Sequence, residues 1–177
     1  MKLYNTCVSS EFACVDSGRF SICYVDNSIK PQPFHTQNTL EIYYSVSSAK
    51  SFIIDGMLFP VNERDVFFVN QFQVHRVEAF EGQAHDRYIL SIMPDHLKSL
   101  SSANTDLTAC FYDKNKFSSR VSLSKSQHRE MIECINTLTN ANGFGSDLIE
   151  NHMLVKIILL INIPNLHQAL MLRLFLF

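Results

Sequence analysis

Short stretches of β-branched and aromatic residues follow one another closely up to about residue 113, with no helical pattern between them. Clusters of turn-forming residues separate these stretches. This density of short strands predicts antiparallel sheets, arranged as a sandwich or barrel, rather than a parallel sheet. The predicted strands are 12–15, 20–25, 39–46, 51–54, 66–69, 73–80 and 87–93. The predicted turns are 16–18, 26–28, 47–50, 55–56, 62–63 and 81–82.

A helical pattern replaces this alternation after Lys116. Ser124 and Gln127 have the spacing of a capping box, which predicts that a helix begins there. One face of this helix is apolar, and the helix is expected to end near Asn142 and Gly143. The residues of that apolar face are Met131, Ile132, Ile135 and Leu138.

A second helix is predicted to begin at Ser146 and to end at Pro164, because proline lacks the backbone N–H that continues a helix. We expect the two helices to form an antiparallel pair. The second helix is apolar over a wider arc than the first helix can cover, so part of it must contact the barrel or another subunit. The apolar tail after Pro164 either packs on a partner or belongs to a chain that continues further.

The composition narrows the class of protein. The 177 residues are enough for one well-buried domain with an appendage, and the formal charge of −2 with a pI near 6.4 disfavours DNA binding by this chain alone. Five cysteines without a CxxC pair indicate buried, reduced thiols. No secretory signal or membrane-spanning stretch is visible, so we expect a cytoplasmic protein without membrane contact.

The segment from residue 34 to residue 44 contains the most informative side chains. His35, Gln37, Glu41 and Tyr43 have the same parity, so an extended strand would place them on one face, and the apolar residues between them would lie on the other. This polar row either lines a pocket inside a barrel or faces solvent, since both placements are physically easy.

The order of motifs along the chain resembles the sensor domain of AraC-family transcription regulators. His35 is followed by Glu41 in an aromatic strand, and a glycine turn at 55–56 precedes an aspartate-led apolar strand from Asp65. His75 and an Arg-Tyr strand from Arg87 complete the pattern.

This resemblance implies the following organisation. Residues 1–115 would form a mainly β, cupin-like barrel (a double-stranded β-helix or jelly roll) with an N-terminal arm, and residues 116–163 a helical dimerisation region. Residues 164–177 would be an apolar tail or a truncated linker. The resemblance further implies a homodimer through residues 124–161, and the DNA-reading half of such regulators is absent from this sequence. One departure is Arg64, which stands where the family has glycine, so we expect an altered turn there.

The resemblance also implies what the barrel would hold. A small polar effector, a sugar or a small acid, would contact polar and aromatic side chains of the barrel strands. Arg87 and Tyr88 are strand neighbours, so their side chains must face opposite ways. Surface ion pairing of Arg87 with Asp86 or Glu78 is the competing interpretation. The expected contact residues are His35, Gln37, Glu41, Tyr43, His75, Arg87 and Tyr88.

A divalent metal is a less favoured occupant of the same position. The metal ligands of the wider cupin superfamily would correspond to His35, Gln37, Glu41 and His75, but a neutral amide at Gln37 is a weak ligand. We therefore expect no cofactor, and with a metal only His35, Glu41 and His75 would bind it. The histidines could also simply form hydrogen bonds in the barrel wall. No independent enzyme motif is present, so we expect no enzyme; the alternative is a metal-dependent cupin isomerase or dioxygenase.

Overall fold

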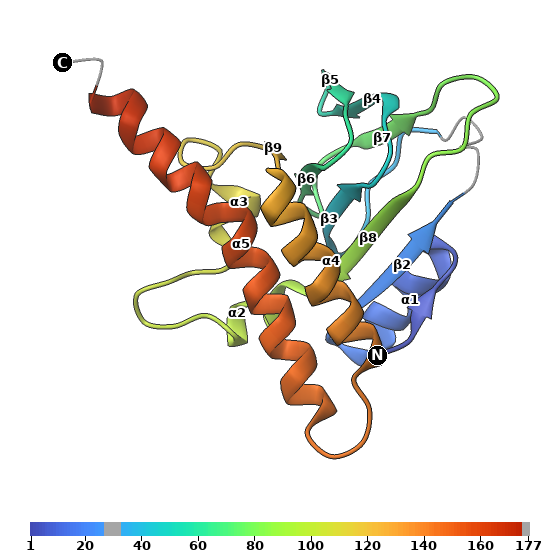
Figure 1. Cartoon of the computed structure of the whole chain (residues 1–177), viewed down its shortest axis with the longest axis vertical. Coiled ribbons are helices and arrows are strands. Elements are labelled where there is room, and N and C mark those ends of the chain that lie inside the picture. Colours follow the sequence, from blue (N-terminus) through green and yellow to red (C-terminus); the bar gives the residue numbers. More distant parts are fainter. Residues whose placement is uncertain (27–32, 175–177) are drawn as a thin grey trace.

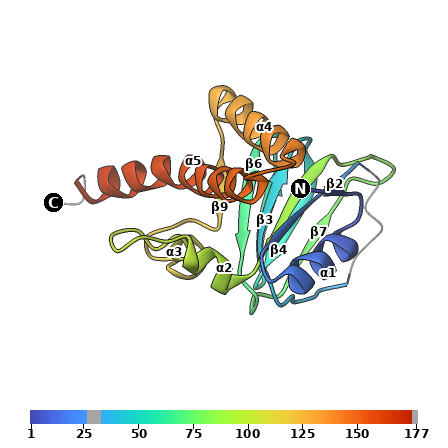
Figure 2. The same ribbon diagram turned by 90° about the horizontal axis from the view of Figure 1, so that it is seen from below.

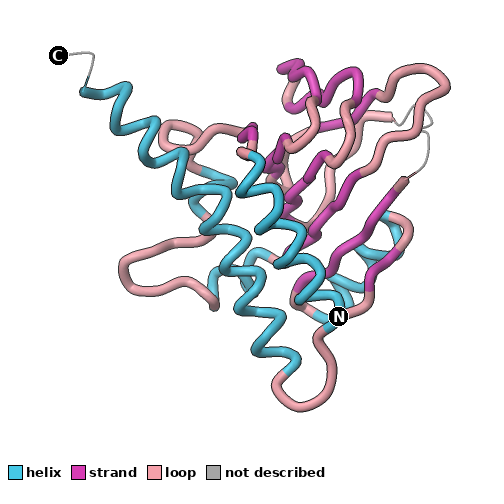
Figure 3. Tube along the Cα trace, viewed as in Figure 1, coloured by secondary structure: helices cyan, strands magenta, loops and turns pink. Residues whose placement is uncertain are grey.

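The structure, a computed structural model, describes residues 1–26 and 33–174, with side chains described up to Asn162. Nine strands and five helices are present in the described residues, and the helices gather toward the C-terminal half (Figures 1 and 3). The strands are β1 (Leu3–Tyr4), β2 (Phe20–Val25), β3 (Leu40–Ser45), β4 (Ala49–Ile54), β5 (Met57–Val61), β6 (Asp65–Val69), β7 (His75–Glu78), β8 (Arg87–Ile92) and β9 (Arg120–Ser122). The helices are α1 (Cys7–Ser17), α2 (Pro94–Ser99), α3 (Ala109–Tyr112), α4 (Lys125–Asn140) and α5 (Ser146–Leu174).

The strands form two sheets. The larger sheet has the order β1-β2-β8-β3-β6-β9, and the smaller sheet has the order β5-β4-β7. All pairings are antiparallel except that of β1 with β2. The prediction of a sheet-rich chain with helices toward its C-terminal end is therefore confirmed.

Strand β3 lies in the middle of the larger sheet, and all six of its residues are buried. Ile42 and Tyr44 belong to an apolar core shared with the helices, whereas Tyr43 belongs to a second core that also includes Phe52 of the smaller sheet. Successive residues of a strand point to opposite faces of its sheet, so burial on both sides means that both faces are covered. The alternation predicted for this segment is confirmed.

The two faces of the larger sheet are covered by different elements. Figure 2 shows α4 and α5 on one side of this sheet and α1 on the other. Gln127 donates a hydrogen bond to the Leu160 carbonyl (3.3 Å), and Lys156 pairs with Glu130 (3.0 Å), so α4 and α5 pack side by side. No described helix is long and apolar enough to cross a membrane.

The helix starts follow the sequence, but one helix end does not. The Ser124 side chain accepts from the Gln127 backbone, and Gln127 returns the bond, which confirms the capping box. Helix α5 begins at Ser146 as predicted, yet it continues through Pro164 to Leu174, so the predicted end at Pro164 is wrong. A proline removes one backbone hydrogen bond from a helix, and the rest of the helix persists on either side of it. The side chains of the apolar tail lie outside those described.

The N-terminal arm is a helix, which corrects the predicted strand at 12–15. Thr6 caps α1 by accepting from the Ser9 backbone (3.2 Å), and Gly18 ends it in the left-handed conformation (φ 65°). Ser10 and Cys14, one turn apart, form its buried side. The arm therefore packs against β2 as an ordered element of the fold.

The six other predicted strands are present, with ends shifted by up to two residues. The short strands β1, β5 and β9 were not predicted.

The 55–56 turn joins β4 to β5 with positive φ at both Asp55 and Gly56, as in a tight hairpin. Arg64 also adopts a positive φ (70°), so the turn keeps its left-handed residue without glycine, and the expected alteration is wrong. Asp65 supports this turn by accepting from the Asn62 backbone (2.7 Å). The turn expected at 26–28 lies mostly outside the described residues.

Candidate functional site

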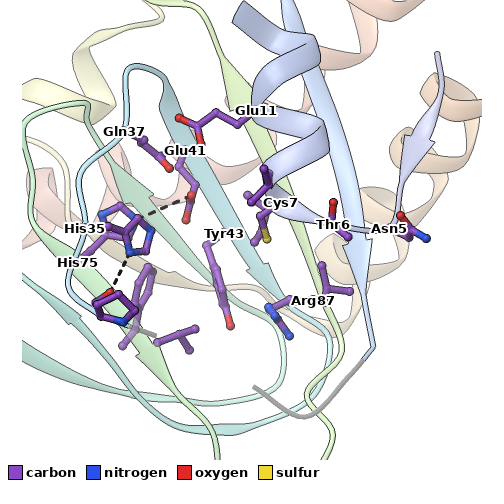
Figure 4. Close-up of a pocket in the computed structure, with 16 residues that line it drawn as sticks. Asn5, Thr6, Cys7, Glu11, His35, Gln37, Glu41, Tyr43, His75 and Arg87 are labelled. Atoms are coloured by element: carbon purple, nitrogen blue, oxygen red, sulfur yellow. Dashed lines mark hydrogen bonds and ion pairs between the residues drawn. The ribbon is translucent and has the colours of Figure 1, made fainter. Parts of the chain in front are cut away.

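A cavity of about 380 Å³ lies between the two sheets and beneath α1 (Figure 4). Strands β3 and β8 supply one wall, and the start of α1 supplies another. Six of the seven side chains expected to contact an effector line this cavity: His35, Gln37, Glu41, Tyr43, His75 and Arg87. The polar row therefore lines a pocket, with Glu41 and Tyr43 buried, Gln37 half-buried and His35 still exposed to solvent.

Glu41, His35 and His75 lie close together at one end of the cavity. The Nε2 atom of His75 is 3.9 Å from a carboxylate oxygen of Glu41, and the His35 and His75 rings have centroids 4.4 Å apart. The two histidines also exchange backbone hydrogen bonds of 3.2 and 3.0 Å, which attach the segment before β3 to strand β7. Glu41 is 6% and His75 2% exposed, so both polar groups are withdrawn from bulk water.

Buried side-chain nitrogen atoms without partners surround the same cavity. Gln37 Nε2, His75 Nε2 and Arg87 Nε are buried and find no hydrogen-bond partner among residues 1–26 and 33–162. Gln37 and Arg87 offer donors, whereas Nδ1 of His75 donates to the Gln73 carbonyl (3.0 Å), so that Nε2 of the neutral ring is an acceptor. Leaving a buried polar group unpaired costs about 1–3 kcal/mol, so such groups in native proteins usually face a ligand or ordered water. Three such atoms around one cavity indicate a site prepared for a molecule with both hydrogen-bond acceptors and donors.

Tyr43 forms the floor of the cavity, and its hydroxyl group is already paired. This hydroxyl forms a hydrogen bond with Nε2 of His85, and the Tyr43 ring packs against Phe52. Burial lowers the pKa of His85 to about 4, with the nearby Arg87 charge adding to the effect, so His85 is neutral at pH 7. Burial raises the pKa of Tyr43 well above its usual value. Tyr43 therefore contributes a ring surface to the cavity, and His85 is a polar partner that the sequence did not reveal.

The side chains of Arg87 and Tyr88 point to opposite faces of β8. Arg87 lines the cavity and donates to the His85 carbonyl (2.8 Å), whereas Tyr88 packs against Tyr24 and stacks on Tyr44. Tyr88 is the one expected contact residue that does not line this cavity, because neighbouring residues of a strand point to opposite faces. Arg87 forms no ion pair with any residue in the described ranges, so the surface ion pair considered for it does not form there.

The start of α1 adds cavity residues that sequence reasoning missed. Thr6, Cys7, Val8 and Glu11 line the cavity together with Asn5. They were missed because the one element predicted in the arm was a strand at 12–15, so nothing indicated which side chains of residues 5–11 face inward. Thr6 at the start of α1 and Gly18 at its end are recognisable capping residues, and they were the sequence signal from which this helix could have been predicted.

The charges around the cavity include both signs. Glu11 and Glu41 are acidic, Arg87 is basic, and the walls between them are apolar, among them Val25 and Ile89. Such a lining suits a small molecule that carries both acceptors and donors on an otherwise apolar frame. In the described part of the chain, no group of three or more His, Cys, Asp or Glu side chains is arranged to hold a metal ion. The arrangement of His35, Glu41 and His75 is therefore not that of a preformed three-ligand metal site.

No protein-family model matches this sequence. No curated protein sequence matches it either. Several solved structures are partly similar. A cupin protein from Bacteroides fragilis is 16% identical with a TM-score of 0.35, over 41% of this chain and 63% of that protein. The matched region thus spans less than two thirds of that cupin protein.

Two further solved structures are similar to part of this chain. The protein KdgF from Halomonas sp. is 17% identical with a TM-score of 0.37, over 42% of this chain and 69% of that one. A mutant of salicylate 1,2-dioxygenase from Pseudoaminobacter salicylatoxidans is 13% identical with a TM-score of 0.37, over 43% of this chain and 22% of that one. Similarities of this size assign no function, which must be argued from the cavity itself.

Proposed function

We propose that this chain is the effector-sensing and self-associating part of an AraC-type transcription regulator. Its two sheets would act as a cupin-like, jelly-roll barrel, and α4 with α5 would be the antiparallel helix pair by which such regulators dimerise. The chain would not be an enzyme and would not bind DNA by itself. The observation that carries this proposal is the cavity lined by three unpaired buried nitrogen atoms, on Gln37, His75 and Arg87.

The effector is a small polar molecule of the sugar or small-acid class. Arg87 and Gln37 offer donors to a carboxylate or to hydroxyl oxygens, and Glu41 accepts from hydroxyl groups of the same molecule. A cavity of about 380 Å³ is at the small end of ligand sites in proteins. The size and polarity together favour a compact ligand with few carbon atoms.

A direct set of contacts connects the cavity to the helix pair. Helix α1 covers the cavity, and its buried Ser10 hydroxyl lies 2.8 Å from that of Ser21 on β2. Arg19, directly after the α1 cap, donates to Glu150 (3.0 Å) and Asn151 (3.2 Å) of α5. An effector that binds one position of α1 better than another would therefore shift α5.

The surface for self-association is the outer face of residues 124–161. Leu148 and Leu159 are 68% and 38% exposed, and they lie eleven residues apart, which places them on the same side of α5. Ile158 is 2% exposed, so a charge there would disrupt the core rather than the surface. We expect Leu159→Lys to convert a dimer to a monomer in light scattering at micromolar concentration, with Tyr112→Lys on another surface as the control. A wild-type chain that is already monomeric contradicts this part of the proposal.

Calorimetric titration against sugars and small carboxylic acids tests the sensing role. We expect one class to bind wild-type protein, and Arg87→Gln to weaken it at least about tenfold, the loss expected for one charge-assisted hydrogen bond. Tyr88→Phe is the matched control, because it alters the neighbouring residue on the other face. Binding that is unaffected by Arg87→Gln, or no binding of either class, contradicts the proposal.

The alternative function is that of a metal-dependent cupin enzyme. The observation in its favour is that His75 Nε2, a possible metal ligand, lies 3.9 Å from a carboxylate oxygen of Glu41. Elemental analysis of protein purified without added metal separates the two functions. Stoichiometric iron, manganese or zinc that is lost in His75→Ala supports the enzyme. Absence of bound metal with retained effector binding supports the sensor.

A further inference from the structure

Two cysteines face each other where α1 meets the larger sheet. Cys7 is the first residue of α1, Cys23 lies in β2, and their sulfur atoms are 3.9 Å apart. Cys7 is exposed and lines the cavity (Figure 4), whereas Cys23 is completely buried. A small reagent that enters the cavity therefore meets the sulfur of Cys7 first.

The two thiols differ in reactivity. Cys23 donates its S–H to the sulfur of Cys7, and this bond lowers the pKa of Cys7, with Arg87 assisting against burial and the Glu41 charge. The same contact, together with burial, raises the pKa of Cys23. The thiolate is the nucleophilic form of cysteine, so Cys7 is the attacking group and Cys23 is the resolving group.

We propose that Cys7 and Cys23 are a redox-sensitive pair, which a peroxide converts into a disulfide that joins α1 to β2 beside the cavity. The pair rests on the contact between the two thiols and is independent of the sensing role. Fixing the start of α1 would hold the cavity wall, to which Glu11 also belongs, in one position.

The chemical steps balance with hydrogen peroxide as the oxidant. The Cys7 thiolate attacks one peroxide oxygen, the O–O bond breaks, and hydroxide leaves, which gives a sulfenic acid at Cys7. The sulfur of Cys23 then attacks the sulfur of Cys7; the S–S bond forms, the S–O bond breaks, and the proton of Cys23 leaves with the hydroxide as water. Overall, two thiols and one peroxide give one disulfide and two waters. The sulfur atoms must approach from 3.9 Å to about 2.05 Å.

The three other cysteines provide the contrast within the same chain. Cys14, Cys110 and Cys134 are buried, and burial raises the pKa of Cys14 and of Cys110 to about 12. Cys14 lies about two turns further along the same helix as Cys7, and its sulfur contacts the Arg19 carbonyl (3.8 Å). Peroxide is therefore expected to leave Cys14 unmodified.

The experiment uses the full chain, reduced and then treated with stoichiometric hydrogen peroxide. Remaining thiols are blocked with N-ethylmaleimide, and the digested protein is analysed by mass spectrometry without reduction. We expect a linked peptide pair containing Cys7 and Cys23, a higher melting temperature than the reduced protein, and reversal of both by dithiothreitol. Cys14→Ser should retain the link, whereas Cys7→Ser should abolish it.

Cys7 is exposed, so Cys7→Ser is expected to fold, and its melting temperature in reductant serves as the check. Cys23→Ala tests the resolving role, since its Cys7 should then stop at sulfenic acid, which dimedone traps. The proposal is overturned if peroxide takes wild-type Cys7 to sulfinic or sulfonic acid, or into links between chains, without joining Cys23. It is equally overturned if no cysteine reacts under conditions that oxidise free glutathione.

Discussion

The two faces of the larger sheet are built from the same strands, yet they have opposite character. On the helix side, β3, β6 and β8 present an unbroken apolar surface that includes Ile42, Phe68 and Leu90. On the cavity side, the intervening residues mix rings and aliphatic chains with Glu41 and Arg87. Strands β3 and β8 therefore each contribute one row to the apolar core and one row to the cavity wall.

The difference teaches where each kind of substitution should act. An apolar row that packs against α4 and α5 gains free energy from every buried methylene, so truncation there costs stability. A row with buried charges and unpaired donors costs free energy in the absence of a ligand, so removing a polar group there should cost binding instead. The predictions below test that division, beginning with the largest expected effect.

Phe68→Ala on the helix side should lower the free energy of unfolding by about 3–5 kcal/mol. The Phe68 side chain is completely buried, and its ring packs edge to face against Phe111 with ring centroids 5.4 Å apart. Truncation to alanine therefore leaves a cavity between the sheet and the helices. Urea unfolding followed by circular dichroism measures the loss. Glu41→Gln is the matched change on the cavity side, where stability should hold or rise while effector binding falls. A larger stability loss in Glu41→Gln than in Phe68→Ala breaks the comparison.

His85 should make the cavity side sensitive to acid. Burial holds its pKa at about 4 in the folded chain, against 6.5 for an ordinary histidine, so the unfolded chain binds more protons between these values. The stability from neutral His85 is complete above about pH 6.5 and is lost as the pH falls toward 4, by up to about 3 kcal/mol. Urea unfolding at several pH values measures the slope, and His85→Gln should flatten it. An unchanged slope in that variant excludes His85 as the cause.

The contact between Arg19 and Glu150 tests whether the two faces communicate. Arg19→Ala should lower stability by about 1 kcal/mol, because the pair is partly buried and Glu150 would lose a charged partner. In a double-mutant cycle with Glu150→Gln, the two losses should be less than additive. If the proposed function is correct, Arg19→Ala should also reduce the effect of effector on dimerisation. Additive losses would show that the two side chains do not interact.

Sequence reasoning succeeded where local pattern and packing agree. The alternation of β3 placed Glu41 and Tyr43 on one face and Ile42 on the other, because both faces of a central strand are buried and only parity separates them. It failed for α1, where the apolar Val8 and Phe12 are 79% and 74% exposed. Exposed apolar residues do not follow the rule that such residues mark the buried face of a helix, so no helix was predicted there and residues 12–15 were predicted as a strand.

Other features depended on distant contacts that no local pattern reveals. His85 enters the site because its turn lies beside Tyr43, forty-two residues earlier in the chain. Helix α5 passes Pro164, although proline usually ends a helix. The contact of Cys7 with Cys23 likewise depends on how α1 packs on β2, which sequence spacing alone does not specify.

The smallest expected effect concerns the start of α4, far from the cavity side. Ser124→Ala should lower the free energy of unfolding by about 1 kcal/mol, because the Gln127 backbone N–H loses its acceptor and one unpaired donor is left at the helix end. Urea unfolding measures the loss, and Lys125→Ala at the neighbouring exposed position is the control. Effector affinity should be unchanged in both variants, since the cap supports only the helix side of the sheet. A reduced affinity in Ser124→Ala would mean that the helix side also shapes the cavity, and the division between the two faces would then be incomplete.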